Sequence, residues 1–270
     1  MVEVDPALID WIGRWIETAD PAAPPPILGI AGSQGSGKST LARAVAQRFG
    51  GAALSLDDVY LTQAERAALA ERMHPLFAVR GPPGTHDLAL LNPLLDRLRA
   101  AGPDEEIRLP RFDKLADERA PETDWAVVRG RPRLIVLEGW CLGATAQRPE
   151  ALTAPVNALE REKDSDGVWR RAVDAALGDG YASLAARLDA LVFLKAPGFE
   201  VVLDWRCEQE AELLGVAAVS PQRRAALAGF IGHYERITRH MLAGGVRPDL
   251  TVELDARRRI VALRPGVETA

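Results

Sequence analysis

Short apolar runs alternate with amphipathic segments along the chain. The apolar runs have the length and composition of buried parallel strands, and they lie at residues 27–31, 52–56, 133–137 and 190–194. Apolar residues at helical spacing predict helices over residues 39–49, 88–100 and 201–214. Because strands alternate with helices, we expect one α/β domain over residues 1–270, with three layers in which helices cover both faces of a mostly parallel sheet.

The two ends of the chain carry further elements. Residues 1–26 are predicted to hold an amphipathic helix, at residues 7–17, and a Pro-rich connector. The acidic polar face of this helix favours packing on the core over binding to a membrane surface. Near the other end, residues 250–263 predict two short strands, and the cationic residues 257–259 between them are interpreted as a solvated hairpin edge.

A glycine-rich motif follows the first predicted strand. Its sequence, GSQGSGKS, matches the pattern G-x-x-x-x-G-K-[ST], in which backbone N–H groups and a helix N-terminus surround phosphate oxygens. In this motif Lys38 reaches the β- and γ-phosphates, the Ser39 hydroxyl binds Mg²⁺, and Thr40 is placed to contact the α-phosphate. The strand before the motif and the helix after it are the context that a P-loop NTPase fold requires. The predicted nucleotide-binding residues are Gly32, Ser33, Gln34, Gly35, Ser36, Gly37, Lys38, Ser39 and Thr40.

The acidic residues after two other strands favour a kinase among the P-loop proteins. The base-reading motif N-K-x-D of GTPases has no match in a suitable position, and the strand before Glu138 ends in that single acid rather than in the acidic pair of many motor ATPases. Asp57 and Asp58 follow the second strand, at the sheet edge where ligands of parallel sheets gather. An acid there can accept a hydroxyl proton or hold a metal during phosphoryl transfer. The alternative is an ordinary turn or helix cap.

Two loops supply cations that suit an anionic acceptor. One loop spans residues 80–87 with the sequence RGPPGTHD, and the other spans residues 109–121 with the sequence LPRFDKLADERAP. A guanidinium pairs with a carboxylate through two hydrogen bonds, so these loops are candidates for binding a small acid. The alternative is that both are exposed loops with solvated charges.

Together these motifs resemble the P-loop small-molecule kinases related to uridine kinase, phosphoribulokinase and pantothenate kinase. More narrowly, the chain resembles the D-glycerate 3-kinase family. The matching stretches run in family order from about residue 30 to about residue 215, and they are GSQGSGKST, SLDDVY, RGPPGTHDL, LPRFDKLADERAP, VLEGW and LKAPGFEVVLDWRCEQE. The second loop lacks the glycine-containing spacer that the resemblance leads us to expect before Arg-Ala-Pro.

The resemblance implies a kinase that uses ATP and Mg²⁺ to phosphorylate a hydroxyl of a small carboxylic acid, namely D-glycerate, to 3-phosphoglycerate. It implies that Asp57 is the general base, that Lys38 and a lid arginine, Arg206, assist transfer, and that residues 59–125 are acceptor-binding insertions. The implied metal ligands are Ser39, Asp57 and Glu138. The implied acceptor-binding residues are Asp58, Arg80, His86, Asp87, Lys114 and Arg119.

Charge and composition limit the partners. The chain has 33 Lys and Arg against 38 Asp and Glu, for a net charge of −5, which argues against a nucleic-acid partner because phosphate binding favours a basic excess. No apolar run approaches the roughly 20 residues that cross a bilayer, and no signal peptide is recognisable. The two cysteines, Cys141 and Cys207, match no metal-binding spacing. We expect a cytoplasmic enzyme with a small-molecule acceptor and no membrane partner.

Two other functions remain open at this point. One is a nucleoside or pantothenate-like kinase of the same superfamily, and the other is a nucleotide-binding switch that hydrolyses slowly and signals through a partner. The sequence does not discriminate between ATP and GTP or specify an oligomeric state.

Overall fold

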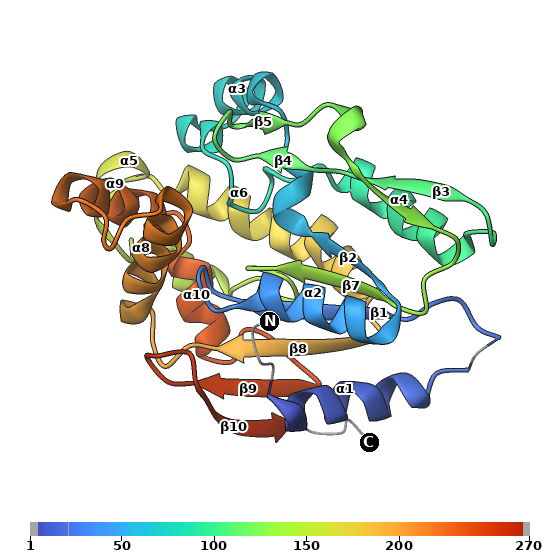
Figure 1. Cartoon of the computed structure of the whole chain (residues 1–270). Helices are drawn as coiled ribbons and strands as arrows, with labels where there is room; N and C mark the ends of the chain where they lie inside the picture. The colour runs from blue at the N-terminus through green and yellow to red at the C-terminus, as the bar shows by residue number, and fades with distance from the viewer. Residues whose placement is uncertain (1–4, 21, 267–270) are drawn as a thin grey trace.

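A six-stranded sheet forms the centre of the computed structural model, which describes residues 5–20 and 22–266. The strand order is β10-β9-β8-β1-β7-β2 (Figure 1). The five strands from β9 to β2 run parallel, and β10 is antiparallel to β9. The strands are β1 (Ile27–Gly32), β2 (Ala52–Ser55), β7 (Ile135–Gly139), β8 (Ala190–Lys195), β9 (Leu250–Leu254) and β10 (Ile260–Pro265). The predicted mostly parallel sheet is confirmed.

Helices cover both faces of this sheet because alternate side chains of each strand enter opposite cores. In β1, Leu28 and Ile30 pack with helices α1 and α2, whereas Ile27 and Ala31 face the core formed with α4, α6 and α10 (Figure 1). The predicted three-layer P-loop fold is therefore confirmed. The helices are α1 (Pro6–Glu17), α2 (Lys38–Phe49), α3 (Gln63–Arg72), α4 (Leu88–Ala100), α5 (Ala158–Lys163), α6 (Val168–Ala176), α7 (Ala182–Ala185), α8 (Glu200–Leu214), α9 (Pro221–Ile231) and α10 (Glu235–Leu242).

Two small hairpins and several short helical turns lie outside the main sheet. One hairpin pairs β3 (Glu106–Leu109) with β6 (Ala126–Arg129), and the other pairs β4 (Phe112–Asp113) with β5 (Glu118–Arg119). Together with α3 and α4 they make up most of the segment between β2 and β7 (Figure 1). That residues 59–125 are acceptor-binding insertions stays a prediction. The short turns are η1 (Leu56–Val59), η2 (Pro75–Ala78), η3 (Glu122–Asp124), η4 (Pro149–Leu152) and η5 (Leu177–Tyr181).

Two predicted strand ends differ from those in the structure. Strand β7 continues to Gly139, two residues beyond the predicted end, because Glu138 and Gly139 still pair with Ile30 and Ala31 of β1. The strand predicted over residues 52–56 ends one residue early, because the Ser55 hydroxyl caps the turn η1 that begins at Leu56. Because Glu138 is polar, the sequence pattern predicts that the strand ends before it, although its backbone pairs normally with β1.

The N-terminal helix packs on the core as predicted. Leu8, Ile12 and Ile16 are buried against α2 and the sheet, and the Asp5 side chain caps the first turn. The connector that follows is described except for residue 21, which lies outside the described residues. In the part of the chain that the structure covers, no helix is long and apolar enough to cross a membrane.

Candidate active site

The P-loop between β1 and α2 is shaped by two glycines in the left-handed region. Gly35 has φ 74° and Gly37 has φ 93°, and Gly37 stands directly before α2. A Cβ on Gly35 would lie 2.6 Å from Cβ of Trp205, so no larger residue fits there. The hydroxyls of Ser33 and Ser36 are buried and have no hydrogen-bond partner among the described residues. Because unpaired buried polar groups cost free energy, these atoms fit a loop that closes around a polar ligand such as phosphate.

Glu138 links the P-loop to the second strand. Its side chain is buried at the end of β7, where Oε1 accepts hydrogen bonds from the Ser39 hydroxyl at 2.6 Å and the Ser55 hydroxyl at 2.8 Å. The other oxygen, Oε2, lies 3.9 Å from Nζ of Lys38 and has no hydrogen-bond partner among the residues described. A hydroxyl and a carboxylate are the oxygen donors that suit Mg²⁺, so Ser39 and Glu138 fit the metal that the sequence predicted.

Asp57 stands at the start of η1, within the same network. Its Oδ2 lies 2.8 Å from Nζ of Lys114, its Oδ1 accepts a hydrogen bond from the Tyr60 hydroxyl at 2.7 Å, and its backbone N–H donates to Ser55. Burial opposes the charged form, but Lys114 and Lys38 outweigh it and hold the pKa of Asp57 well below its usual value. Asp57 is therefore an ionised acceptor at neutral pH, and it sits at the edge of the sheet where the P-loop also lies.

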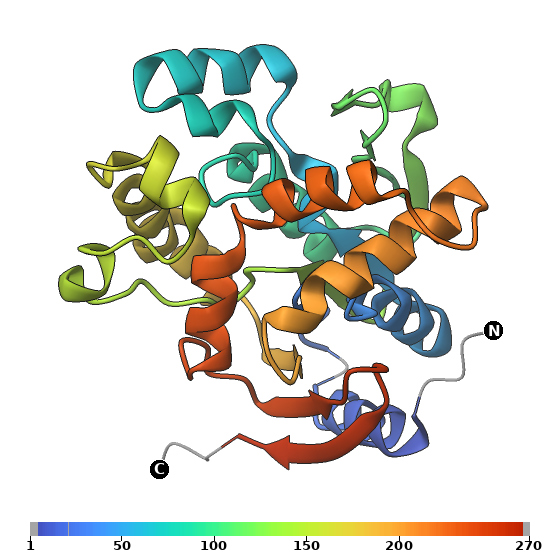
Figure 2. The ribbon, with the colours of Figure 1, turned by 90° about the vertical axis from the view of Figure 1, so that its left-hand side faces the viewer.

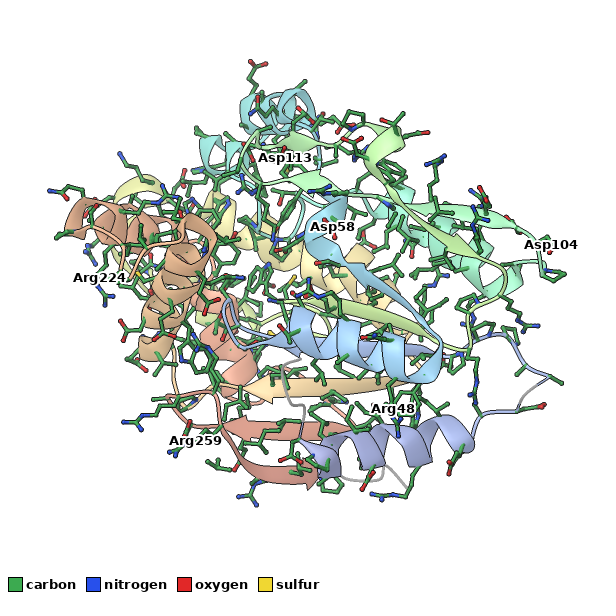
Figure 3. All side chains as sticks on the ribbon, viewed as in Figure 1. Arg48, Asp58, Asp104, Asp113, Arg224 and Arg259 are labelled. Carbon is green, nitrogen blue, oxygen red and sulfur yellow. The ribbon has the colours of Figure 1, made fainter. Side chains whose placement is uncertain are left out.

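Asp58, the neighbouring acid, has a different environment. Its Oδ1 accepts a hydrogen bond from the Phe112 backbone N–H at 3.2 Å, so it anchors β4 rather than pairing with a lysine. Burial raises the pKa of Asp58 to about 6. Figure 3 labels Asp58 beyond the end of β2 and Asp113 in the hairpin above it. The acidic pair thus separates into Asp57, which is ionised and paired with Lys114, and Asp58, which holds β4 in place.

The hairpin that carries Lys114 is held by a residue outside the predicted set. Asp117 has a left-handed backbone with φ 55°, and its carboxylate pairs with Nη2 of Arg66 at 2.6 Å and with the guanidinium of Arg80. Arg80 also donates to the backbone carbonyl of Lys114 at 3.2 Å. Arg66 is almost fully buried. Asp117 therefore occupies the conformation that the missing glycine would favour, and it adds a charge that binds both arginines.

We expect Asp117→Asn to loosen this hairpin without straining it, because asparagine tolerates the left-handed backbone but carries no charge. The free energy of unfolding should fall by about 1–3 kcal/mol, because the buried Arg66 loses a charge-assisted hydrogen bond, and the KM for an anionic acceptor should rise. Asp117→Ala should cost about 1 kcal/mol more, from backbone strain. Urea unfolding measures the free energies of unfolding of both variants and the wild type. Asp124→Asn, at an exposed acid of the next turn, is the control. Equal stability of Asp117→Asn and wild type would contradict a stabilising role for the contacts of Asp117 with Arg66 and Arg80.

The loop with sequence RGPPGTHD is packed against aromatic side chains. A Cβ on Gly81 would lie 1.9 Å from the Tyr234 hydroxyl, which explains the glycine. The His86 ring lies 4.7 Å from the Tyr60 ring between centroids, and its Nδ1 hydrogen-bonds the Tyr181 hydroxyl. Burial lowers the pKa of His86 to about 4, so its imidazole is neutral at pH 7.

Asp87 and Arg119 hold each other. The Asp87 carboxylate caps α4 through the backbone N–H of Leu90 at 2.9 Å and accepts from Nη2 of Arg119, also at 2.9 Å. The same Nη2 donates to the carbonyl of Tyr60 at 3.1 Å. The structure thus brings Arg119 next to the residues around Asp57, while Asp87 is engaged by protein partners on both oxygens. Contact of either residue with an acceptor stays a prediction.

Arg206 forms its ion pair within helix α8 rather than with these residues. It pairs with Glu210 on the same helix at 2.7 Å, and Glu210 also binds Arg223 of α9, so α8 and α9 form a cross-linked helical hairpin (Figure 2). The residue before it, Trp205, is the one that packs on Gly35. Arg206 therefore lies one residue from a P-loop contact, but its described ion pair is within the hairpin. Its catalytic role stays a prediction.

The interpretation of residues 257–259 as a solvated edge is wrong for Arg258. Its Nε donates to the carbonyl oxygen of Gly35 at 2.7 Å, so the turn between β9 and β10 reaches the P-loop. Arg259, labelled in Figure 3, pairs with Asp255 inside the hairpin instead. The two arginines are adjacent in sequence, but Arg258 has a left-handed backbone, with φ 61°, and its side chain takes a different direction from that of Arg259.

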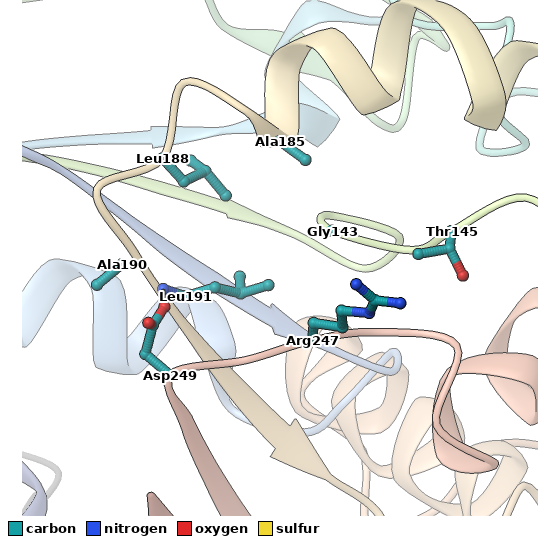
Figure 4. Close-up of a pocket in the computed structure, with 8 residues that line it drawn as sticks. All are labelled: Gly143, Thr145, Ala185, Leu188, Ala190, Leu191, Arg247 and Asp249. Carbon is teal, nitrogen blue, oxygen red and sulfur yellow. Dashed lines mark hydrogen bonds between the residues drawn. The ribbon is translucent and has the colours of Figure 1, made fainter. Parts of the chain in front are cut away.

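A cavity of about 230 Å³ lies elsewhere in the molecule. It adjoins the first residues of β8 and the segment before β9, whereas the P-loop follows the opposite end of β1 (Figure 4). Predicted site residues are absent from its lining, which consists of Gly143, Thr145, Ala185, Leu188, Ala190, Leu191, Arg247 and Asp249. The candidate active site is therefore the P-loop edge of the sheet rather than this cavity.

The fold and this site define a P-loop kinase: the loop lysine and serine meet an acid of β7, and a second acid follows β2 beside them. In sequence, the chain is 34% identical over 221 residues to "Uncharacterized kinase mug58" of Schizosaccharomyces pombe, which covers 76% of this chain and 78% of the yeast protein. The chain belongs to the same family as this kinase. The resemblance of its motifs to the D-glycerate 3-kinase family agrees with a solved structure of that name, which shares the fold.

Solved structures share the fold over nearly the whole chain. D-glycerate 3-kinase from Cryptococcus neoformans superposes with a TM-score of 0.75 at 22% identity, over 97% of this chain and 100% of that one. The protein YGR205w superposes with a TM-score of 0.70 at 24% identity, over 97% and 96% of the two chains. No family model matches the sequence.

Proposed function

We propose that this kinase transfers the γ-phosphoryl group of ATP, with Mg²⁺, to a hydroxyl of D-glycerate and forms 3-phosphoglycerate. The observation that carries the proposal is the pairing of Asp57 with Lys114 at 2.8 Å. The carboxylate can accept a hydroxyl proton, and the ammonium, whose side chain is 55% exposed, can turn to the carboxylate of a small acid. A hydroxy acid carries both groups within a few ångströms of each other.

The cations around Asp57 favour an acid over a neutral acceptor. Lys114 lies on the hairpin that Arg80 holds, and Arg119 donates to the carbonyl of Tyr60, whose hydroxyl binds Asp57. A nucleoside has no carboxylate that Lys114 could bind. The structural likeness to a protein named D-glycerate 3-kinase supports the same acceptor.

At the nucleotide end, the P-loop backbone and Lys38 would bind the phosphates, and Ser39 and Glu138 would hold the metal. Bound there, Mg²⁺ would neutralise charge on the phosphate oxygens. Asp57 would take the hydroxyl proton as the acceptor oxygen attacks in line. Arg206 would stabilise the charge spread over the transferring group once its helix approaches.

Purified protein with Mg-ATP is expected to release ADP rapidly only when D-glycerate is present, because the acceptor supplies the hydroxyl. A coupled assay measures this, with glycerol as the matched control that has the hydroxyls without the carboxylate. If nucleosides or pantothenate stimulate ADP release and D-glycerate does not, the protein is a kinase for those acceptors and the D-glycerate proposal is wrong. Slow acceptor-independent hydrolysis alone would favour a nucleotide switch and remove the kinase assignment to D-glycerate.

Lys114→Met is expected to raise the KM for D-glycerate by about tenfold or more, the loss expected when a charge-assisted hydrogen bond is removed. The KM for ATP should change little, since Lys114 contacts Asp57 rather than the P-loop. Initial rates over a grid of both substrates separate the two constants. Lys163→Met, at an exposed lysine of α5, is the control. A larger rise in the KM for ATP would contradict this placement.

A further inference from the structure

The turn between β9 and β10 meets the P-loop through one side chain. Besides donating from Nε to the Gly35 carbonyl, the Arg258 guanidinium lies 5.4 Å from the centre of the Trp205 ring and pairs with Glu208. The Trp205 indole N–H in turn donates to the carbonyl of Ala256 at 2.8 Å. Three segments that are distant in sequence, the P-loop, helix α8 and the hairpin turn, therefore meet around this arginine.

The carbonyl that Arg258 holds determines where the next amide points. In a trans peptide the C=O and the following N–H point in opposite directions, so fixing the Gly35 oxygen outward directs the Ser36 N–H inward. In the structure that N–H closes a turn by donating to the Ser33 carbonyl at 3.2 Å, so the contact from Arg258 and this turn together set the shape of the loop. Inward N–H groups are what a P-loop offers to phosphate oxygens. Gly35, with φ 74° and no side chain, has a wide conformational range that an outside contact can restrict.

The backbone of Arg258 itself supports a specific role. Its φ of 61° is a conformation that side chains other than glycine and asparagine rarely adopt, and a turn at this position would ordinarily favour glycine. Its neighbour Arg257 is exposed and has an ordinary backbone. The two arginines carry the same charge and are adjacent in sequence, but only Arg258 is described in contact with the P-loop. Arg257 is therefore a matched control.

We propose that Arg258 is a positioning residue for the nucleotide: it fixes the Gly35–Ser36 peptide in the loop conformation that receives the phosphates, and it holds helix α8, which carries Arg206, against the P-loop. This inference rests on the nucleotide half of the proposed function and is independent of the acceptor. It extends the nucleotide site to a turn near the end of the chain, more than 200 residues from the P-loop in sequence.

The test is calorimetric binding of Mg-ATP and of magnesium tripolyphosphate, without an acceptor, to wild type, Arg258→Gly, Arg258→Lys and Arg257→Ala. Glycine suits the left-handed turn, so Arg258→Gly removes the guanidinium without strain. We expect its Kd for both ligands to rise by about tenfold, the effect of a lost charge-assisted hydrogen bond. Arg258→Lys should recover part of this loss, and Arg257→Ala should bind as wild type. Arg258→Gly should still unfold cooperatively without ligand, at a somewhat lower temperature because the contacts to Trp205 and Glu208 are lost.

Each other outcome overturns the proposal in a distinct way. Unchanged binding of both ligands to Arg258→Gly would mean that the P-loop is oriented without the arginine. A loss for ATP alone would mean that Arg258 contacts the base or ribose. An equal rise in Kd for Arg257→Ala would mean that any positive charge in this turn attracts the phosphates, without the contact to Gly35. A failure of D-glycerate as acceptor would leave every one of these results unaffected, because the measurement contains no acceptor.

Discussion

Asp57→Asn is expected to lower acceptor-dependent turnover by about 10³-fold, within the range that a general base contributes. Asparagine keeps the size of the side chain and can still accept from Tyr60, but it cannot take a proton from the acceptor hydroxyl. The affinity for ATP should change little, because Asp57 contacts Lys114, Tyr60 and Ser55 rather than the P-loop backbone. Single-turnover rates and nucleotide titration measure the two effects separately.

Asp58→Asn is the matched control for this prediction. It changes the adjacent acid, whose carboxylate holds the Phe112 N–H instead of a lysine, so its effect should fall on the hairpin and hence on the acceptor KM. Near-normal turnover of Asp57→Asn would exclude Asp57 as the base. An equal loss in both variants would mean that the turn geometry matters rather than the ionised carboxylate.

The P-loop and its sheet could be predicted because their determinants are contiguous. The glycine pattern, Lys38 and Ser39 lie within one short segment, and the apolar runs around it have the length of buried strands. Glu138 could also be placed, since the edge of a parallel sheet brings the ends of neighbouring strands together. In the structure that acid does accept from Ser39.

The residues that the sequence did not identify act over long sequence distances. Arg66 resembles any helical arginine until Asp117, 51 positions away, is found against it. Arg258 looked like one member of a cationic triplet, and only the folded chain shows which of the three reaches Gly35. For Asp117 the sequence offered one indication. The turn between Lys114 and Arg119 contains no glycine, so another residue there had to adopt a left-handed backbone, and in the structure this is Asp117.

Arg206 illustrates a different limit. Its place on α8 could be predicted, but whether it meets the transferring phosphate depends on the position of the helical hairpin. The structure places it in an ion pair with Glu210, which also binds Arg223. Helix α8 is in turn connected to the P-loop through Trp205 and Arg258.

Glu138→Gln is expected to lower turnover by about 10²-fold or more and to shift the Mg²⁺ requirement to higher concentrations. The glutamine keeps the shape but removes the charge that faces Lys38 at 3.9 Å and accepts from Ser39 and Ser55. An amide oxygen is a weaker ligand for Mg²⁺ than a carboxylate, and the unbalanced Lys38 should still attract the phosphates. The Kd for ATP measured without Mg²⁺ should therefore stay the same or fall.

Activity over a range of Mg²⁺ concentrations distinguishes the two roles that Glu138 can have. If it supports the metal, excess Mg²⁺ should restore part of the turnover of Glu138→Gln. If it only balances Lys38, turnover should stay low at every concentration. Ser55→Ala is the control: it removes one hydrogen bond from Glu138 and the cap on the Asp57 N–H, so it can lower turnover, but it leaves the Glu138 carboxylate and Ser39 in place for the metal. A metal role for Glu138 thus requires a Mg²⁺-dependent deficit in Glu138→Gln that is absent from Ser55→Ala, and a parallel deficit in both would assign the effect to the position of the side chain.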